Sequence, residues 1–170
     1  MQLNKNIVLL GMMGSGKSTI GYLLSKKLDL KFKDVDKIIE KETEHKISWI
    51  FESKGENYFR ELEEKITLRL LKSDKNIISL GGGAFINENV RKEVLSKSLS
   101  FWLYWNNSTI IKRIFKSKKR PIAFKASSFE INKLITDRSK IYSLANYKIN
   151  CEKLSKNMII KKIIDIYEKN

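Results

Sequence analysis

Apolar runs of strand length alternate along the chain with helix-length amphipathic segments. Five short runs rich in Ile, Val, Leu and aromatic residues have the length of buried strands. We expect these strands at residues 6–10, 30–34, 76–80, 99–105 and 146–151. The segments between them carry apolar residues at three- and four-residue spacing, as amphipathic helices do. We expect these helices at residues 16–28, 36–43, 48–53, 55–73, 88–97, 108–116, 129–144 and 156–168.

Polar residues that can cap a helix stand at the beginning of several expected helices. We expect Ser48, Asn87 and Ser155 to accept hydrogen bonds from free backbone N–H groups there. Strands that alternate with helices imply a parallel sheet that helices cover on both faces. The sequence therefore predicts an α/β fold, a three-layer doubly wound five-stranded parallel sheet. No linker or shift in composition divides the chain, so we expect a single domain over residues 1–170.

A glycine-rich segment joins the first expected strand to the first expected helix. Residues 11–18 read Gly-Met-Met-Gly-Ser-Gly-Lys-Ser and match the pattern G-x-x-x-x-G-K-[ST] at every fixed position. Glycines let the backbone curl so that several N–H groups point at an anion, and the following helix adds its positive N-terminal end. A glycine-rich turn that matches by chance is the alternative, but the strand before it and the helix after it favour a phosphate-binding loop. The predicted fold is then that of a P-loop NTPase.

The residue types in this loop predict how a nucleoside triphosphate binds. Lys17 can reach the β- and γ-phosphates, and the Ser18 hydroxyl can bind Mg²⁺. We therefore expect ATP as the co-substrate and Mg²⁺ as the metal. The expected ATP-binding residues of the loop are Gly14, Ser15, Gly16, Lys17, Ser18 and Thr19. Many kinases and ATPases share such a loop, so the loop alone does not identify the acceptor.

Two carboxylates close the second expected strand, in the sequence Asp34-Val35-Asp36. Residues two apart in a strand point to the same side, so both carboxylates could face one cleft. In a doubly wound sheet the ligand crevice lies at the carboxyl ends of the strands, where this pair falls. One carboxylate could hold a metal-bound water, and the other could accept a proton from an alcohol. The alternative is an Asp that only caps the following helix, and the presence of a pair favours function.

The net charge of +15 could indicate a nucleic-acid-binding protein. The basic residues are 28 Lys and six Arg scattered along the chain, whereas nucleic-acid readers rely on Arg for bidentate and stacked contacts. We therefore expect no nucleic-acid partner. No apolar run approaches the roughly 20 residues that span a bilayer, so we also expect no membrane association. A lone cysteine, Cys151, and the absence of a leader-like N-terminal pattern fit a cytoplasmic protein.

Further motifs follow the phosphate-binding loop in a fixed order and give the chain a family resemblance. They are Asp34-Val35-Asp36, Ile50-Phe51, Gly55-Glu56-x-x-Phe59-Arg60-x-x-Glu63, Ser79-Leu80-Gly81-Gly82-Gly83-Ala84, Arg120-Pro121, and Arg138 with Tyr142. In this order and spacing the chain resembles the shikimate kinases over nearly its whole length. The resemblance implies a fold like that of the nucleoside monophosphate kinases with a mobile lid. It also implies a monomer that uses ATP to phosphorylate the 3-hydroxyl of shikimate.

The resemblance implies a role for each motif. Asp36 would bind the substrate hydroxyls and act as the catalytic base, and Asp34 would lie near the water shell of Mg²⁺. Shikimate carries a carboxylate and three hydroxyls, and Arg60 and Arg138 suit the carboxylate because a guanidinium makes forked hydrogen bonds. The glycines after the third strand would let the substrate approach the backbone, and two phenylalanines would wall the pocket. The expected substrate-binding residues are Asp36, Phe51, Phe59, Arg60, Gly81, Gly82, Gly83 and Arg138.

The polar, cation-rich stretch at residues 117–128 is expected to form a lid over the site. A lid excludes water, which would otherwise hydrolyse ATP. Arg120 would move in from the lid to contact ATP and neutralise charge on the transferring phosphoryl group, as a third catalytic residue beside Lys17 and Asp36. The alternative for this stretch is a solvated run of charges. Arg113, on the helix before the lid, would stack on the adenine.

Two other functions remain open at this point. One is a different small P-loop kinase that acts on gluconate or a nucleoside monophosphate. The two arginines suited to a carboxylate and the triple glycine count against a nucleotide acceptor. The other is a nucleic-acid-binding protein gated by a nucleotide, which only the net charge suggests.

Several aromatic and reactive side chains are expected to have no special role. Trp49, Trp102 and Trp105 should pack in the core, and the last two should point to opposite faces of one strand. His45 lies in a polar stretch and should be an exposed surface residue. Cys151 should pack as a small buried side chain.

Overall fold

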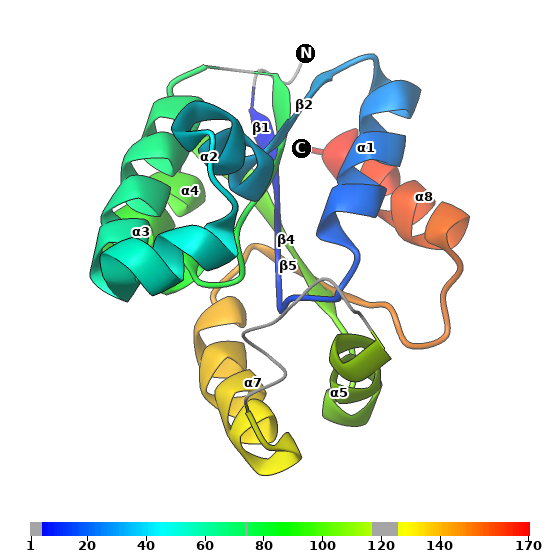
Figure 1. Ribbon diagram of the computed structural model, residues 1–170. Coiled ribbons are helices and arrows are strands. Elements are labelled where there is room, and N and C mark those ends of the chain that lie inside the picture. The colour runs from blue at the N-terminus through cyan, green and yellow to red at the C-terminus, as the bar shows by residue number, and fades with distance from the viewer. Residues whose placement is uncertain (1–4, 74, 117–125) are drawn as a thin grey trace.

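The structure of the protein is a computed structural model that describes residues 5–73, 75–116 and 126–170 (Figure 1). At its centre lies a five-stranded sheet with the strand order β2-β3-β1-β4-β5. Every pair of neighbouring strands is parallel. The strands are β1 (Asn6–Leu10), β2 (Lys31–Asp34), β3 (Asn76–Ser79), β4 (Ser98–Tyr104) and β5 (Tyr147–Asn150). The predicted five-stranded parallel sheet is therefore confirmed.

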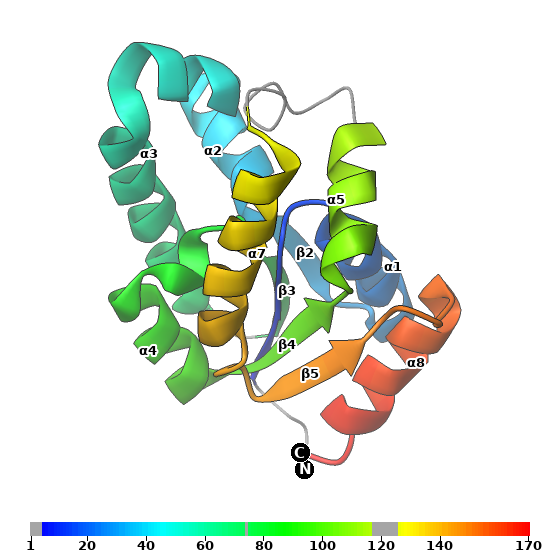
Figure 2. The ribbon, with the colours of Figure 1, turned by 90° about the horizontal axis from the view of Figure 1, so that it is seen from below.

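Helices cover both faces of the sheet and complete the three layers of a doubly wound α/β fold (Figures 1 and 2). Figure 1 shows α1 and α8 on one side of the strands and α2, α3 and α4 on the other, with α5 and α7 at the lower end. The helices are α1 (Lys17–Leu28), α2 (Val35–Thr43), α3 (Ile47–Leu71), α4 (Glu88–Lys97), α5 (Asn107–Lys116), α7 (Ser128–Tyr142) and α8 (Lys156–Tyr167), with a short 3₁₀ helix η1 (Ala84–Ile86). Within the described ranges, no helix combines the length and the apolar character needed to cross a membrane.

The alternation of side chains along β1 divides the core into two halves. Val8 and Leu10 pack with residues of α2, α3, α4 and α7 in one half, whereas Ile7 and Leu9 pack with α1 and α8 in the other. All four side chains are buried, because helices cover both faces of a central parallel strand. The sheet is thereby fixed between two apolar layers, and it positions the loops that follow its strands.

The central strand β1 has β3 on one side and β4 on the other. The chain therefore crosses over the sheet in both directions from β1, and the loop after β1 lies at the switch point. Ligands of doubly wound sheets bind at this place, outside the carboxyl ends of the strands. Residues 11–16 after β1, residues 80–83 after β3 and the end of β2 meet at this edge.

Helix α3 covers the two helices that the sequence predicts at residues 48–53 and 55–73. Its two parts meet at Gly55, whose backbone (φ 84°, ψ 168°) is not helical, so the predicted division into two helices is confirmed. The prediction that Ser48 caps it was wrong, because the helix begins at Ile47. The N–H of Ile47 donates to Glu40 Oε1 at 3.2 Å, so a carboxylate from α2 takes the place of the predicted hydroxyl. The predicted caps Asn87 and Ser155 are confirmed at α4 and α8.

The side chains that were expected to pack in the core differ in how far they are buried. Trp102 is buried, as predicted, and so is Cys151. Trp49 is 41% exposed and stacks on the exposed ring of His45, with the ring centroids 3.7 Å apart. The prediction that Trp49 lies in the core was therefore wrong, because a surface ring pair takes up one face of its indole. Trp105 is half-buried and lies just beyond the end of β4.

Candidate active site

The loop after β1 and the start of α1 form a pocket of about 250 Å³ at the carboxyl edge of the sheet. Gly11, Gly14 and Gly16 have φ angles of 138°, 82° and 93°, which residues with a side chain rarely adopt. Gly16 is the N-cap of α1, so the positive end of this helix opens on the pocket. Six ATP-binding residues were predicted in the loop, and five of them line this phosphate pocket: Gly14, Gly16, Lys17, Ser18 and Thr19. The sixth, Ser15, is buried.

Lys17 is buried in the phosphate pocket, and the loop itself holds its ammonium group. Nζ donates to the carbonyl oxygens of Gly11 and Met12 at 2.8 and 3.0 Å. These bonds keep the ammonium group within the curl of the loop, on the wall of the pocket. The side chain is only 8% exposed, so water screens its charge weakly and an anion in the pocket would interact with it strongly.

Asp34 and Asp36 both line the phosphate pocket, although not for the reason that the strand pattern gives. The strand β2 ends at Asp34, and Asp36 already belongs to the first turn of α2. The prediction that strand alternation aligns the two carboxylates was therefore wrong. Asp34 caps α2, because its Oδ1 accepts a hydrogen bond from Lys37 N at 3.3 Å. Asp34 thus both caps a helix and faces the pocket, and the helical turn brings Asp36 to the same wall.

The surroundings of Asp34 fit a divalent cation. Asp34 Oδ2 is buried and has no hydrogen-bond partner among the described residues, so it can accept from a metal-bound water. Ser18 lines the same pocket and carries a hydroxyl oxygen. In the part of the chain that the structure describes, no group of three His, Cys, Asp or Glu side chains could hold a metal ion. A cation in this pocket would therefore take further ligands from phosphate oxygens and water.

Burial raises the pKa of the Asp36 carboxyl above its ordinary value. The charge of Lys17 opposes this rise in pKa, whereas the charges of Asp34 and Glu40 add to it. A carboxylate with a raised pKa is a better proton acceptor than an exposed one. Asp36 is thus suited to the role of a general base at the edge of the phosphate pocket.

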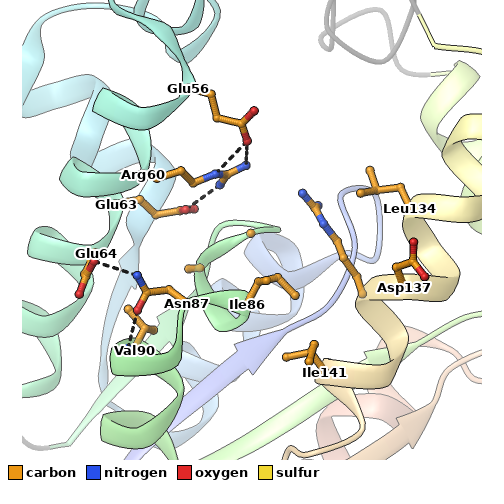
Figure 3. Close-up of a pocket in the computed structure, with 13 residues that line it drawn as sticks. Glu56, Arg60, Glu63, Glu64, Ile86, Asn87, Val90, Leu134, Asp137 and Ile141 are labelled. Atoms are coloured by element: carbon orange, nitrogen blue, oxygen red, sulfur yellow. Dashed lines mark hydrogen bonds and ion pairs between the residues drawn. The ribbon is translucent and has the colours of Figure 1, made fainter.

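A larger pocket of about 490 Å³ lies between α3, η1 and α7 (Figure 3). Arg60 from α3 and Arg138 from α7 both line it. Figure 3 shows Arg60 and Glu63 on one side of this pocket, opposite Leu134 and Asp137 of α7. Two guanidinium groups around one cavity suit a carboxylate ligand, because each offers N–H donors in a fixed fork. We refer to this cavity as the arginine pocket.

Two carboxylates and two aromatic rings hold Arg60 in place. Nη1 donates to Glu63 Oε2 at 2.7 Å, and Nε and Nη2 donate to Glu56 Oε1 at 3.2 and 3.1 Å (Figure 3). The Arg60 Cζ atom lies 5.1 Å from the ring centroid of Phe59 and 5.8 Å from that of Phe51. At these distances an aromatic ring attracts a cation. The structure therefore places both predicted phenylalanines against the guanidinium group of Arg60.

The glycines after β3 leave room for the charged side chains around them. A Cβ atom at Gly81 would overlap Glu63 Oε1 and would lie 2.8 Å from Asp36 Oδ1. A Cβ atom at Gly83 would overlap the guanidinium group of Arg60. Side chains at these positions would therefore displace the groups that line the two pockets.

Gly82 is the point at which the two pockets meet. It lines the phosphate pocket, and a Cβ atom there would lie 3.3 Å from Nη1 of Arg138, which lines the arginine pocket. The carbonyl oxygen of Gly82 accepts a hydrogen bond from the hydroxyl of Tyr142. Burial raises the pKa of Tyr142 to about 12, so the phenol keeps its proton and remains a donor. A ligand in the arginine pocket can thus extend toward a phosphate group in the other pocket.

A model of the shikimate kinase family matches residues 13–168 of the chain. The chain belongs to the shikimate kinase family. A shikimate kinase of Sulfurihydrogenibium sp. is 39% identical over 160 residues, which are 94% of this chain and 96% of the relative. The resemblance inferred from the motifs is therefore confirmed.

Solved structures of the shikimate kinase family share the fold over almost the entire chain. The Acinetobacter baumannii enzyme in complex with shikimate has a TM-score of 0.91 and 28% identity, and the match covers 99% of this chain and 96% of that one. The Aquifex aeolicus enzyme has a TM-score of 0.86 and 34% identity, with 96% of each chain covered. These matches agree with the P-loop kinase fold that the sequence predicts.

Not every predicted site residue of this family member falls within the described structure. Arg120 and residues 117–125 of the predicted lid lie outside the described residues. Arg113 lies against the ring of Trp105, with its Cζ 3.5 Å from the ring centroid. Its predicted stacking on adenine stays a prediction, as do the roles of the residues that line the two pockets.

Glu63 is a pocket residue that the sequence prediction left out of the site. Its side chain is buried, with Oε2 paired to Arg60 and Oε1 without a hydrogen-bond partner in the described ranges. Burial raises the pKa of the Glu63 carboxyl, and the charge of Arg60 opposes the rise. One sequence signal was present, since a residue three positions after Arg60 on a helix lies on the same face.

Proposed function

We propose that this protein transfers the γ-phosphoryl group of ATP to the 3-hydroxyl of shikimate, with ADP and 3-phosphoshikimate as products. Membership of the shikimate kinase family supports the reaction. The observation that carries the proposal is that a phosphate pocket and a pocket with two arginines meet at Gly82. Such an arrangement suits in-line transfer between a triphosphate and an acidic alcohol.

ATP would bind with its triphosphate in the phosphate pocket. The backbone of the loop, the N-terminal end of α1 and the ammonium group of Lys17 all present positive charge there. Ser18, with Asp34 acting through a water, would hold Mg²⁺, which would neutralise charge on the phosphates. The buried and unpartnered Oδ2 atom of Asp34 supports this assignment. Removal of divalent cations with a chelator should therefore abolish turnover.

Shikimate would bind with its carboxylate between Arg60 and Arg138 in the arginine pocket. Glu56 and Glu63 fix the position of Arg60, so its remaining N–H donors point in a defined direction. The ring hydroxyls would then face Asp36 and the backbone around Gly82. A ligand held at both ends in this way has little freedom to turn, which brings one hydroxyl into line with the phosphate pocket.

In the transfer step Asp36 would accept the proton of the 3-hydroxyl. The oxygen of that hydroxyl forms a bond to the γ-phosphorus, and the bond from this phosphorus to the bridging oxygen of ADP breaks. The raised pKa of Asp36 supports its role as the proton acceptor. Lys17, whose charge acts on Asp36, would compensate the negative charge that moves toward the phosphates.

We further propose that residues 1–170 act as a single domain, and that the protein is a cytoplasmic monomer without nucleic-acid or membrane partners. The lining of both pockets by one chain supports a monomer that needs no partner for its site. Residues 117–128 would close over the bound substrates as a lid, and Arg120 would contact ATP from it. Closure would exclude water from the γ-phosphate.

A panel of acceptors tests the proposed function. Purified protein with saturating MgATP is offered shikimate, gluconate or a nucleoside monophosphate, and ADP release is followed by a coupled assay. Of the three acceptors, we expect only shikimate to be turned over rapidly. NMR of the product should show the phosphate on the 3-oxygen. Rapid phosphorylation of gluconate or a nucleotide without turnover of shikimate would refute the assignment. Steep salt-dependent binding to nucleic acid would support the alternative that the net charge suggests.

A further inference from the structure

Trp105 lies between the phosphate-binding loop and helix α5, outside the residues that the proposed function uses. It is half-buried and packs against both halves of the core. Its indole Nε1–H donates a hydrogen bond to the carbonyl oxygen of Ser15 at 3.0 Å. Ser15 stands 90 residues earlier in the chain, in the middle of the phosphate-binding loop. An aromatic side chain that was expected only to fill the core therefore contacts the loop directly.

The bond to Ser15 orients one peptide group of the loop. A peptide group is planar, and none in the described residues is cis. The carbonyl of Ser15 and the N–H of Gly16 therefore point in opposite directions. Trp105 holds the carbonyl on its own side, and this directs the N–H of Gly16 away from the indole. Gly16 lines the phosphate pocket, so an N–H group fixed in this way is available to an anion there.

The face of the same indole supports Arg113. The Arg113 Cζ atom lies 3.5 Å from the ring centroid of Trp105. From this position Arg113 Nη1 donates to the carbonyl oxygen of Gly14 at 3.4 Å. Consecutive carbonyl groups of the loop, at Gly14 and Ser15, are thus held from one side by an arginine and a tryptophan that contact each other. The loop contains three glycines with positive φ, so bonds from outside limit its freedom considerably.

The segment that carries Trp105 and Arg113 is itself anchored. Glu152, just after β5, accepts hydrogen bonds from the backbone N–H of Asn106 at 3.1 Å and from the hydroxyl of Thr109 at 2.5 Å. Both partners belong to the start of α5 or the residue before it. The N–H of Cys151 also donates to the carbonyl oxygen of Tyr104 at 2.9 Å. These hydrogen bonds fix the backbone on either side of Trp105, so the indole can hold the loop in one geometry.

We propose that Trp105 is a positioning residue for the nucleotide. It acts through the carbonyl of Ser15 and through Arg113, and it does not reach the arginine pocket. This inference rests on the proposed function, because it assumes that the phosphate pocket binds ATP. It adds that Trp105 helps to fix the geometry of that pocket. Loss of the indole should therefore weaken the use of ATP and leave the use of shikimate unchanged.

Two substitutions separate the contributions of the indole. Trp105→Phe keeps a ring for Arg113 and removes the N–H donor, whereas Trp105→Leu removes both. We expect KM for ATP to rise about fivefold in the first variant and about twentyfold in the second. KM for shikimate should stay within about twofold of the wild-type value in both. Trp49→Phe is the matched control, because it removes an exposed indole far from the loop in sequence, and both KM values should be unchanged.

Calorimetric titration with ADP and thermal unfolding without nucleotide complete the test. We expect Trp105→Phe to bind ADP about fivefold more weakly and to unfold within about 3 °C of the wild type. If Trp105→Phe has the same ADP affinity and the same KM for ATP as the wild type, the inference is overturned. The proposed function still holds in that case, provided that the protein phosphorylates shikimate. A parallel rise of both KM values with a large fall in Tm would mean a structural role and would also overturn it. A wild-type protein that neither binds ADP nor phosphorylates shikimate would overturn both proposals.

Discussion

The phosphate pocket and the arginine pocket differ in how the chain builds them. The phosphate pocket is formed largely by one continuous segment, residues 11–19, whose backbone conformation depends on glycines and on the start of a helix. The arginine pocket is formed by side chains from α3, η1 and α7. Its key arginine on α3 is held in turn by two glutamates and two phenylalanines. Substitution of one of the few key residues in the phosphate pocket should therefore abolish activity. Substitutions around the arginine pocket should reduce the affinity for the acceptor by graded amounts.

Replacement of Lys17 should have the largest effect. Lys17→Ala removes the buried ammonium group of the phosphate pocket, and we expect kcat to fall roughly 10³-fold or more. Lys26→Ala is the matched control, because it removes an exposed lysine from the same helix, α1. Steady-state kinetics of both variants provide the comparison. Near-normal turnover by Lys17→Ala would mean that the phosphate pocket does not bind the reacting phosphate.

Asp36→Asn should reduce kcat about 10²-fold, because the amide cannot accept the proton of the acceptor hydroxyl. The affinity for ATP should be retained, and Asp165→Asn on the surface of α8 should change neither quantity. Kinetics with a separate ATP titration would measure this. A wild-type kcat at saturating ATP would contradict the role of Asp36 as the base, even if the affinity for ATP fell.

Asp36→Asn should also be more stable than the wild type at neutral pH. The pKa of Asp36 is raised in the folded state, so the folded protein binds this proton more tightly than the unfolded chain does. The resulting stability is present below the ordinary pKa of 3.8 and is lost as the pH rises through the pKa of the folded state. The Tm of Asp36→Asn should therefore exceed that of the wild type at pH 7.5, and the difference should shrink toward pH 4. A lower Tm at pH 7.5 would show that the ionised carboxylate stabilises the fold.

Arg138→Lys should raise KM for shikimate about 30-fold, because an ammonium group cannot make the forked pair of hydrogen bonds to a carboxylate. KM for ATP should be unchanged, since the substitution alters the arginine pocket. Arg69→Lys replaces an exposed arginine of α3 and serves as the control. An equal change in both KM values would mean that the two pockets are not independent.

Gly83→Ala should give the smallest of these effects. The backbone of Gly83 (φ −100°, ψ −16°) is accessible to alanine, so the added methyl group acts mainly by displacing the guanidinium group of Arg60. We expect KM for shikimate to rise about fivefold while Tm changes by only about 3 °C. Kinetics and thermal unfolding of the same sample separate the two effects. An unchanged KM would mean that the position of Arg60 is not critical for the acceptor.

The features that depend on neighbouring residues could be predicted from the sequence. The sheet followed from five apolar runs, and the phosphate loop followed from a strand, three glycines and a helix in succession. The reason given for the pairing of Asp34 and Asp36 was wrong, because a helix begins directly after Asp34 and changes the periodicity from two to 3.6. Local pattern thus identified the carboxylates, although not the geometry that brings them together.

The features that depend on distant residues could not be predicted in this way. The buried side chain of Glu63 lies against Gly81, which comes after β3 and is distant from Glu63 in the sequence. Trp105 contacts a loop 90 residues away, and nothing in the sequence around Trp105 indicates that contact. The two arginines were identified only by family resemblance, because nothing in their local sequence shows that α3 and α7 face one pocket.

The rate of ADP release at saturating MgATP, with and without shikimate, tests most directly whether the two pockets act on one acceptor. If they do, purified protein will release ADP rapidly only when shikimate is present, and each ADP will be matched by one 3-phosphoshikimate. Release of ADP at the same rate without shikimate, or with no phosphorylated shikimate formed, would contradict a joint site at Gly82.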